Sequence, residues 1–131
     1  MWTTFPLPTI IKHLAAQTDV PVFLHLYYGP GLEYNLRCLH DGYSSVMYDG
    51  HTLSLEAALA ETAVIARVAH ALGSAVEGEL GTFGDHQGSL EFTDPEQVPL
   101  MFEQGNVDML AVSVGSEHGQ ASRLQMDLLK A

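Results

Sequence analysis

Residues 54–81 read SLEAALAETAVIARVAHALGSAVEGELG and join a helical pattern to an apolar strand. Ser54 is an N-cap candidate, Glu56 lies in the expected first turn, and Gly73 is expected to end the helix. Between these signals one face carries apolar or small residues at helical spacing: Leu55, Leu59, Thr62, Ala66 and Ala69. Residues 74–81 then predict a strand. A helix followed directly by a buried strand is the building unit of α/β proteins.

The same alternation extends over the rest of the chain. Four strands are predicted, at residues 20–26, 44–50, 74–81 and 107–115, and their continuous apolar character is typical of strands buried on both faces. A first helix is predicted with Pro8 in its first turn, and a second one ends before Gly42, which is expected to be a left-handed helix stop. Asp94, Pro95 and Gln97 predict the start of a fourth, as a cap, a first-turn proline and a capping-box residue, and Pro99 should weaken its first turn.

This order predicts one α/β domain over residues 1–131 with a four-stranded parallel sheet. A sheet of this size is either a small doubly wound sheet or one half of a (β/α)8 barrel, which typically has roughly 250 residues. Neither GxxxxGK[ST] nor GxGxxG follows a predicted strand, which argues against the nucleotide-binding versions of the fold.

The charge balance excludes several classes of partner. The chain has 131 residues, 16 of them acidic and 5 basic, and a formal charge of −11. Nucleic acids and anionic membrane surfaces are therefore not expected partners. We find no uncharged apolar run of about 18 residues, and residues 1–13 lack the basic-then-apolar order of a signal peptide. A cytoplasmic protein is the expectation, with the single cysteine, Cys38, as a small buried apolar residue.

Polar side chains gather where the predicted strands end, which is where parallel α/β proteins place their chemistry. The residues in question are Tyr27 and Tyr28, Asp49 and His51, Glu77 and Glu79, and Glu117 and His118. Carboxylates and imidazoles that converge from different strands suit a divalent metal or acid/base catalysis. His118 is either a metal ligand or an ordinary polar loop residue, and His25 is expected to be a satisfied histidine of the core.

Five separated segments resemble one enzyme family. They are DVPVFLHLYYG, GYSSVMYDG, AHALGSAVEGELG, FTDPEQ and VDMLAVSVGSEHG. In order and approximate spacing they are similar to segments of the class II, zinc-dependent ketose-bisphosphate aldolases, which include fructose- and tagatose-bisphosphate aldolases. The resemblance implies a partial TIM barrel whose four strands are the family's third to sixth. The first two and last two strands of the family pattern are absent from the chain, so we expect a truncated, half-barrel member.

The resemblance also implies roles for individual residues. Tyr27 stands where the family has its proton-transfer aspartate, and Tyr28 where it has a zinc histidine. Glu79 and His118 match residues near or on the metal, and Gly119 matches a glycine that approaches substrate phosphate. A phenol titrates near pH 10 and is not a usual zinc ligand. Asp49 keeps a supporting position at the end of its strand.

The family reaction is reversible aldol cleavage of a ketose bisphosphate to dihydroxyacetone phosphate and an aldehyde, with zinc as Lewis acid. We expect this chain to have little or no such activity and weak or absent zinc binding. Three alternatives remain. A rearranged metal site of His51, Glu79 and His118 is chemically admissible. The chain could be a non-catalytic interaction or assembly protein, paired as a homodimer. It could also be an active aldolase completed by a complementing barrel fragment.

Overall fold

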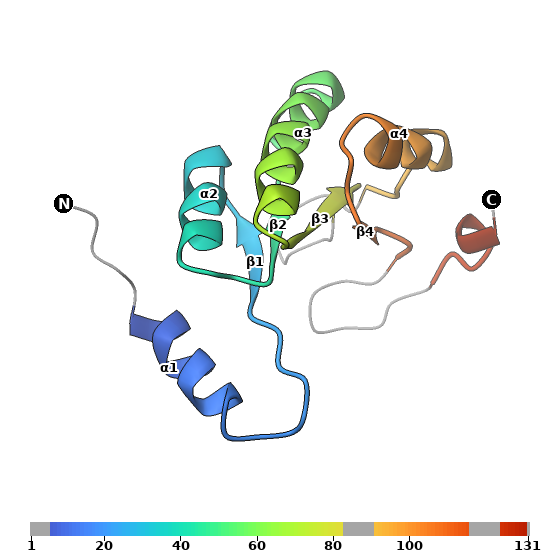
Figure 1. Ribbon diagram of the computed structural model, residues 1–131. Coiled ribbons are helices and arrows are strands. Elements are labelled where there is room, and N and C mark those ends of the chain that lie inside the picture. The colour runs from blue at the N-terminus through green and yellow to red at the C-terminus, as the bar shows by residue number, and fades with distance from the viewer. Residues whose placement is uncertain (1–5, 83–90, 116–123, 131) are drawn as a thin grey trace.

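The computed structural model describes residues 6–82, 91–115 and 124–130. Its elements follow the order of an α/β chain, as Figure 1 shows. They are α1 (Pro6–Ala15), β1 (His25–Gly29), α2 (Leu32–His40), β2 (Ser45–Tyr48), α3 (Leu55–Ala71), β3 (Ala75–Leu80), the 3-10 turn η1 (Pro95–Gln97), α4 (Val98–Glu103), β4 (Met109–Val112) and the 3-10 turn η2 (Leu128–Lys130).

The four strands form one parallel sheet in the order β1-β2-β3-β4. Each strand thus lies next to its neighbour in the sequence, with a helix in the connection, as in a segment of a (β/α)8 barrel. This sheet confirms the predicted fold class. No helix in the described part of the chain is long and apolar enough to cross a membrane.

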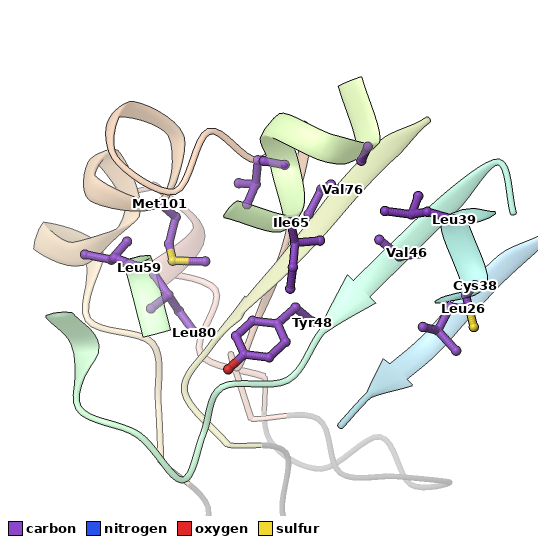
Figure 2. Close-up of a cluster of buried hydrophobic side chains, with 13 residues drawn as sticks. Leu26, Cys38, Leu39, Val46, Tyr48, Leu59, Ile65, Val76, Leu80 and Met101 are labelled. Carbon is purple, nitrogen blue, oxygen red and sulfur yellow. The ribbon is translucent and has the colours of Figure 1, made fainter. Parts of the chain in front are cut away.

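The core lies between the sheet and the helices that cover one of its faces (Figure 2). Ile65 and Val76 are completely buried where α3 crosses β3. Tyr48 fills the space near the end of β2, and its hydroxyl donates a 2.6 Å hydrogen bond to Oε2 of Glu61 on α3. In β3, Val76, Gly78 and Leu80 are buried and alternate with half-buried residues, so one side of the strand faces the helices and the other faces away.

The first strand differs from its prediction. We predicted it at residues 20–26, but β1 spans His25–Gly29, and Val20, Val22 and Phe23 are 68, 47 and 77 % exposed. The apolar run indicated burial, whereas pairing with β2 decides where the strand begins, since His25 is the first residue in register with Ser45. Tyr27 and Tyr28 therefore lie within the strand rather than after it.

The helix boundaries follow the sequence signals closely. The Ser54 hydroxyl accepts a hydrogen bond from the backbone N–H of Ala57, as an N-cap should. Gly42 and Gly73 have φ angles of 84° and 75°, the left-handed conformation expected of helix stops. The predicted fourth helix begins as the 3-10 turn η1 and becomes α-helical at Val98. Gln97 donates to the Asp94 side chain rather than closing a capping box.

The first helix lies apart from the sheet (Figure 1). Its predicted apolar stripe is largely exposed, with Ile10 at 53 % and Leu14 at 59 %. A hydrogen bond from Lys12 Nζ to the carbonyl of Asp41 ties this helix to the end of α2. The apolar faces of α1 and of the segment before β1 are therefore available to other surfaces.

Candidate functional site

Two side chains after β2 form the most direct polar contact of the candidate site. Asp49 follows the last residue of β2, and the chain then turns through Gly50 to His51. The Asp49 carboxylate lies 2.6 Å from Nδ1 of His51 and also accepts a hydrogen bond from the His51 backbone N–H. A carboxylate in this position fixes the imidazole ring and leaves Nε2 directed elsewhere. The His51 side chain is half-exposed.

Glu79 occupies the neighbouring strand β3, on the side that faces away from the helices. Burial is the main cause that raises its pKa to about 7, and the negative charges of Asp49 and Glu77 act in the same direction. His51 and a hydrogen bond from Tyr28 act against the rise. One carboxylate oxygen, Oε2, is buried without a hydrogen-bond partner among the described residues. Glu79 therefore exchanges its proton near neutral pH, as a general acid or base must.

Tyr27 and Tyr28 lie in β1 and place two phenol rings at the same carboxyl end of the sheet. Their ring centroids are 4.3 Å apart and the rings meet edge to face. Tyr28 has a φ of 55°, which breaks the regular register between Leu26 and Gly29 and turns the ring toward the site. Burial, followed by the hydrogen bond with Tyr27 and the charge of Glu79, raises the pKa of Tyr28. Tyr28 thus stays a neutral phenol at physiological pH.

A cavity of about 170 Å³ opens beside these residues, between the ends of β2 and β3 and the start of α3. His51 and Glu79 line it together with Glu91 and Asp94, and Leu55, Phe92 and Met101 supply apolar walls. The described residues that line this cavity include no Lys or Arg. Its charge is thus set by carboxylates and one imidazole, which does not favour an anionic ligand.

Thr93, which is buried, and Gly81 fix the backbone next to this cavity. The Thr93 hydroxyl donates to the carbonyl of Leu80 and accepts from the backbone N–H of Ser113, and so links the ends of β3 and β4. Gly81 follows β3 with a φ of 85°, and a Cβ there would lie 2.6 Å from the carbonyl oxygen of Glu91. Only glycine fits this turn without strain.

Comparison with known proteins assigns this arrangement to a family. The family model described as "Fructose-bisphosphate aldolase class-II" matches residues 4–131. The chain belongs to the class II fructose-bisphosphate aldolase family. Among curated relatives, the fructose-bisphosphate aldolase of Streptococcus pyogenes serotype M3 is 41% identical over 104 residues, which cover 76% of this chain and 35% of that protein. The 6-phospho-5-dehydro-2-deoxy-D-gluconate aldolase of Shouchella clausii is 35% identical over 121 residues, 86% of this chain and 41% of that aldolase.

Solved aldolase structures agree with the fold. The YdjI aldolase of Escherichia coli K12 superposes with a TM-score of 0.81 at 28% identity. The match covers 95% of this chain and 45% of the YdjI chain. The putative fructose-1,6-bisphosphate aldolase of Coccidioides immitis gives the same TM-score at 26% identity, over 95% of this chain and 48% of its own. The chain thus spans less than half the length of these aldolases.

The structure brings together part of the predicted site. Tyr28, Asp49, His51 and Glu79 interact with one another at the carboxyl edge of the sheet. His118 and Gly119 lie outside the described residues, so the rearranged site of His51, Glu79 and His118 remains a prediction. His25 has polar partners, as predicted, since its Nδ1 lies 2.7 Å from Oγ of Ser45 and its Nε2 lies 3.4 Å from the carboxylate of Glu77, but it is only partly buried and does not belong to the hydrophobic core.

The sequence did not predict two of the observed contacts. The hydrogen bond between Tyr28 and Glu79 depends on the left-handed backbone at Tyr28. The residue type at this position does not predict that conformation, because tyrosine seldom adopts it. The His51–Asp49 pair was missed, although the spacing Asp-Gly-His after a strand is a usable signal for an aspartate that bonds two residues ahead.

The described donor set does not fit the zinc ion that class II aldolases use. No three His, Cys, Asp or Glu side chains within residues 6–82, 91–115 and 124–130 are grouped so that they could hold a metal. The orphaned oxygen of Glu79 is one suitable ligand, but the neighbouring position is occupied by the neutral phenol of Tyr28, which donates to the same carboxylate. A zinc site needs three or four protein ligands.

Proposed function

We propose that this chain keeps the scaffold of a class II ketose-bisphosphate aldolase and has lost zinc-dependent aldol cleavage. One observation carries the proposal: Tyr28 and Tyr27 stand at the positions where the family resemblance puts a zinc histidine and the proton-transfer aspartate. A neutral phenol hydrogen-bonded to Glu79 supplies neither an imidazole lone pair nor a base of suitable pKa. The two tyrosines are thus enough to explain the proposed loss, and the parts of the aldolase barrel that this chain does not span are a second reason to expect it.

The residues that remain suggest what the site still does. Glu79, with a pKa of about 7, can accept or release a proton at its buried carboxylate. The Asp49 carboxylate orients His51, which lines the cavity. A phosphorylated ketose or dihydroxyacetone phosphate is the substrate class that the resemblance implies. The carboxylates of the cavity disfavour such an anion unless residues outside the described part supply positive charge.

An assay of aldol cleavage tests this proposal. Purified chain is incubated with fructose or tagatose bisphosphate and added zinc, and the release of triose phosphate is measured. We expect background rates for the natural sequence and for the double variant Tyr27→Asp/Tyr28→His. We give Tyr34→His as the matched control, because Tyr34 is an exposed tyrosine on α2, away from the site. Cleavage above background by the natural chain would contradict the proposal. Cleavage by the double variant alone would show that the two tyrosines account for the whole loss.

A second candidate function, as a non-catalytic interaction or assembly protein, is favoured by the exposed apolar residues around β1. Val20, Phe23 and Tyr27 are 68, 77 and 60 % exposed. A partner would be a second copy of the chain or a complementing barrel fragment.

We also propose that the protein is cytoplasmic and that, like its family, it belongs to carbohydrate metabolism such as glycolysis.

A further inference from the structure

The sheet ends in two strands that each have a neighbour on one side only. Within the described residues the order is β1-β2-β3-β4, so β1 and β4 are its edges. An edge strand presents free backbone N–H and C=O groups that pair readily with another chain. Both edges also carry exposed apolar side chains, Phe23 at 77 % just before β1 and Met109 at 42 % at the start of β4. Neither edge is protected by a lysine or proline within its strand.

The total surface of the chain is larger than that of a closed monomer. Its accessible area is 8485 Å². The scaling law for compact monomers gives about 6,800 Å² for its 14.2 kDa, an excess of about 1,700 Å². If each of two copies covered that excess, the interface would bury about 3,400 Å² in total, which lies within the roughly 2,000–5,000 Å² typical of obligate homodimers. The surplus, which also includes the surface of α1 where it lies apart from the sheet, is of the size that a stable dimer needs.

We propose that two copies of this chain close on each other as an eight-stranded barrel, with β4 of each copy paired to β1 of the other. A two-fold axis along the barrel keeps all eight strands parallel, which is the direction that both free edges require. The coverage agrees, because one chain spans 45% and 48% of two solved aldolase chains, so that two copies supply about one barrel. The high negative charge opposes open-ended growth and favours this closed pair. The inference goes beyond the proposed loss of aldol cleavage and does not depend on it.

Sedimentation equilibrium at low micromolar concentration tests the closed pair. The natural chain should give the mass of a dimer, unfold cooperatively and bind little hydrophobic dye. Phe23→Lys and Met109→Lys each place a charge on one edge and should weaken the dimer at least tenfold while circular dichroism shows retained helix and strand. Phe102→Lys is the matched control, because Phe102 is 43 % exposed but lies on α4, in the helical layer. It should leave the dimer unchanged.

Mixing the two edge variants provides a test specific to this pairing. Each homodimer carries a charge in both of its β4–β1 contacts, whereas a mixed dimer of Phe23→Lys and Met109→Lys has one contact with no substitution. The mixture should therefore form more dimer than either variant alone. A well-folded monomer of the natural chain, or association without a limiting size, would overturn the proposal. So would a dimer that Ile10→Lys on α1 dissociates and the edge variants do not.

Discussion

The substitution Glu79→Gln should change how the stability of the protein depends on pH. In the folded chain, burial and the nearby carboxylates of Asp49 and Glu77 raise the pKa of Glu79 from 4.5 to about 7. The folded state thus holds a proton that the unfolded chain releases between about pH 4.5 and 7. Linkage then requires that the contribution of Glu79 to the free energy of unfolding is fully present below pH 4.5 and is lost as the pH rises through about 7. Glutamine has the same shape and no proton to lose.

The size of the effect follows from the same pKa values. A displacement of the pKa from 4.5 to about 7 corresponds to an upper value of about 3 kcal/mol. Because the side chain is only partly buried, solvent screening reduces the expected effect to about 1–2 kcal/mol. Between pH 4.5 and 8, the natural chain should lose this amount of stability relative to Glu79→Gln.

Urea denaturation at half-unit steps from pH 4.5 to 8 measures the difference. Glu103→Gln serves as the control, since it removes the same charge from an exposed position at the end of α4. Its curve should run parallel to that of the natural chain over the whole range. If the curve of Glu79→Gln were also parallel, Glu79 would ionise as an ordinary exposed carboxylate, and our description of the site as a buried carboxylate cluster would be refuted.

Two further substitutions test other parts of the fold. Burial opposes ionisation of Asp108, but hydrogen bonds from the Val76 N–H (2.8 Å) and from His70 (2.9 Å) outweigh it and lower the pKa. Asp108→Asn should therefore lose about 1 kcal/mol of stability at pH 7. This loss should vanish as the pH falls below the lowered pKa of Asp108, because the natural side chain is then protonated as well. A loss that is constant with pH would contradict this account. Ile65→Ala should cost about 2–5 kcal/mol in chemical denaturation, because Ile65 is completely buried between α3 and the sheet. A cost below about 1 kcal/mol would mean that α3 does not pack on the sheet as described.

Local signals in the sequence predicted the helices better than the edges of the sheet. Ser54 and Gly73 mark the ends of α3 because a cap and a left-handed stop are properties of a few neighbouring residues. The start of β1 depends instead on which residues find a partner in β2. Val20 and Val22 are of a residue type that favours strands, but pairing with β2 begins only at His25.

The candidate site shows a similar division. The position of Asp49 and Glu79 at the carboxyl edge follows from strand order alone, so the sequence predicted it. The contact between Tyr28 and Glu79 requires a positive φ at an aromatic residue, an uncommon conformation that tertiary packing imposes. Pattern and propensity carry no information about such a position.

Zinc titration of the purified chain by isothermal calorimetry tests the central claim most directly, namely that the scaffold of a class II aldolase is kept here without its metal chemistry. The described residues supply Glu79 but no group of three ligands, and Tyr28 donates to that same carboxylate. We predict that the natural chain shows no stoichiometric binding at micromolar zinc. One zinc ion per chain, bound with sub-micromolar affinity, would contradict the account.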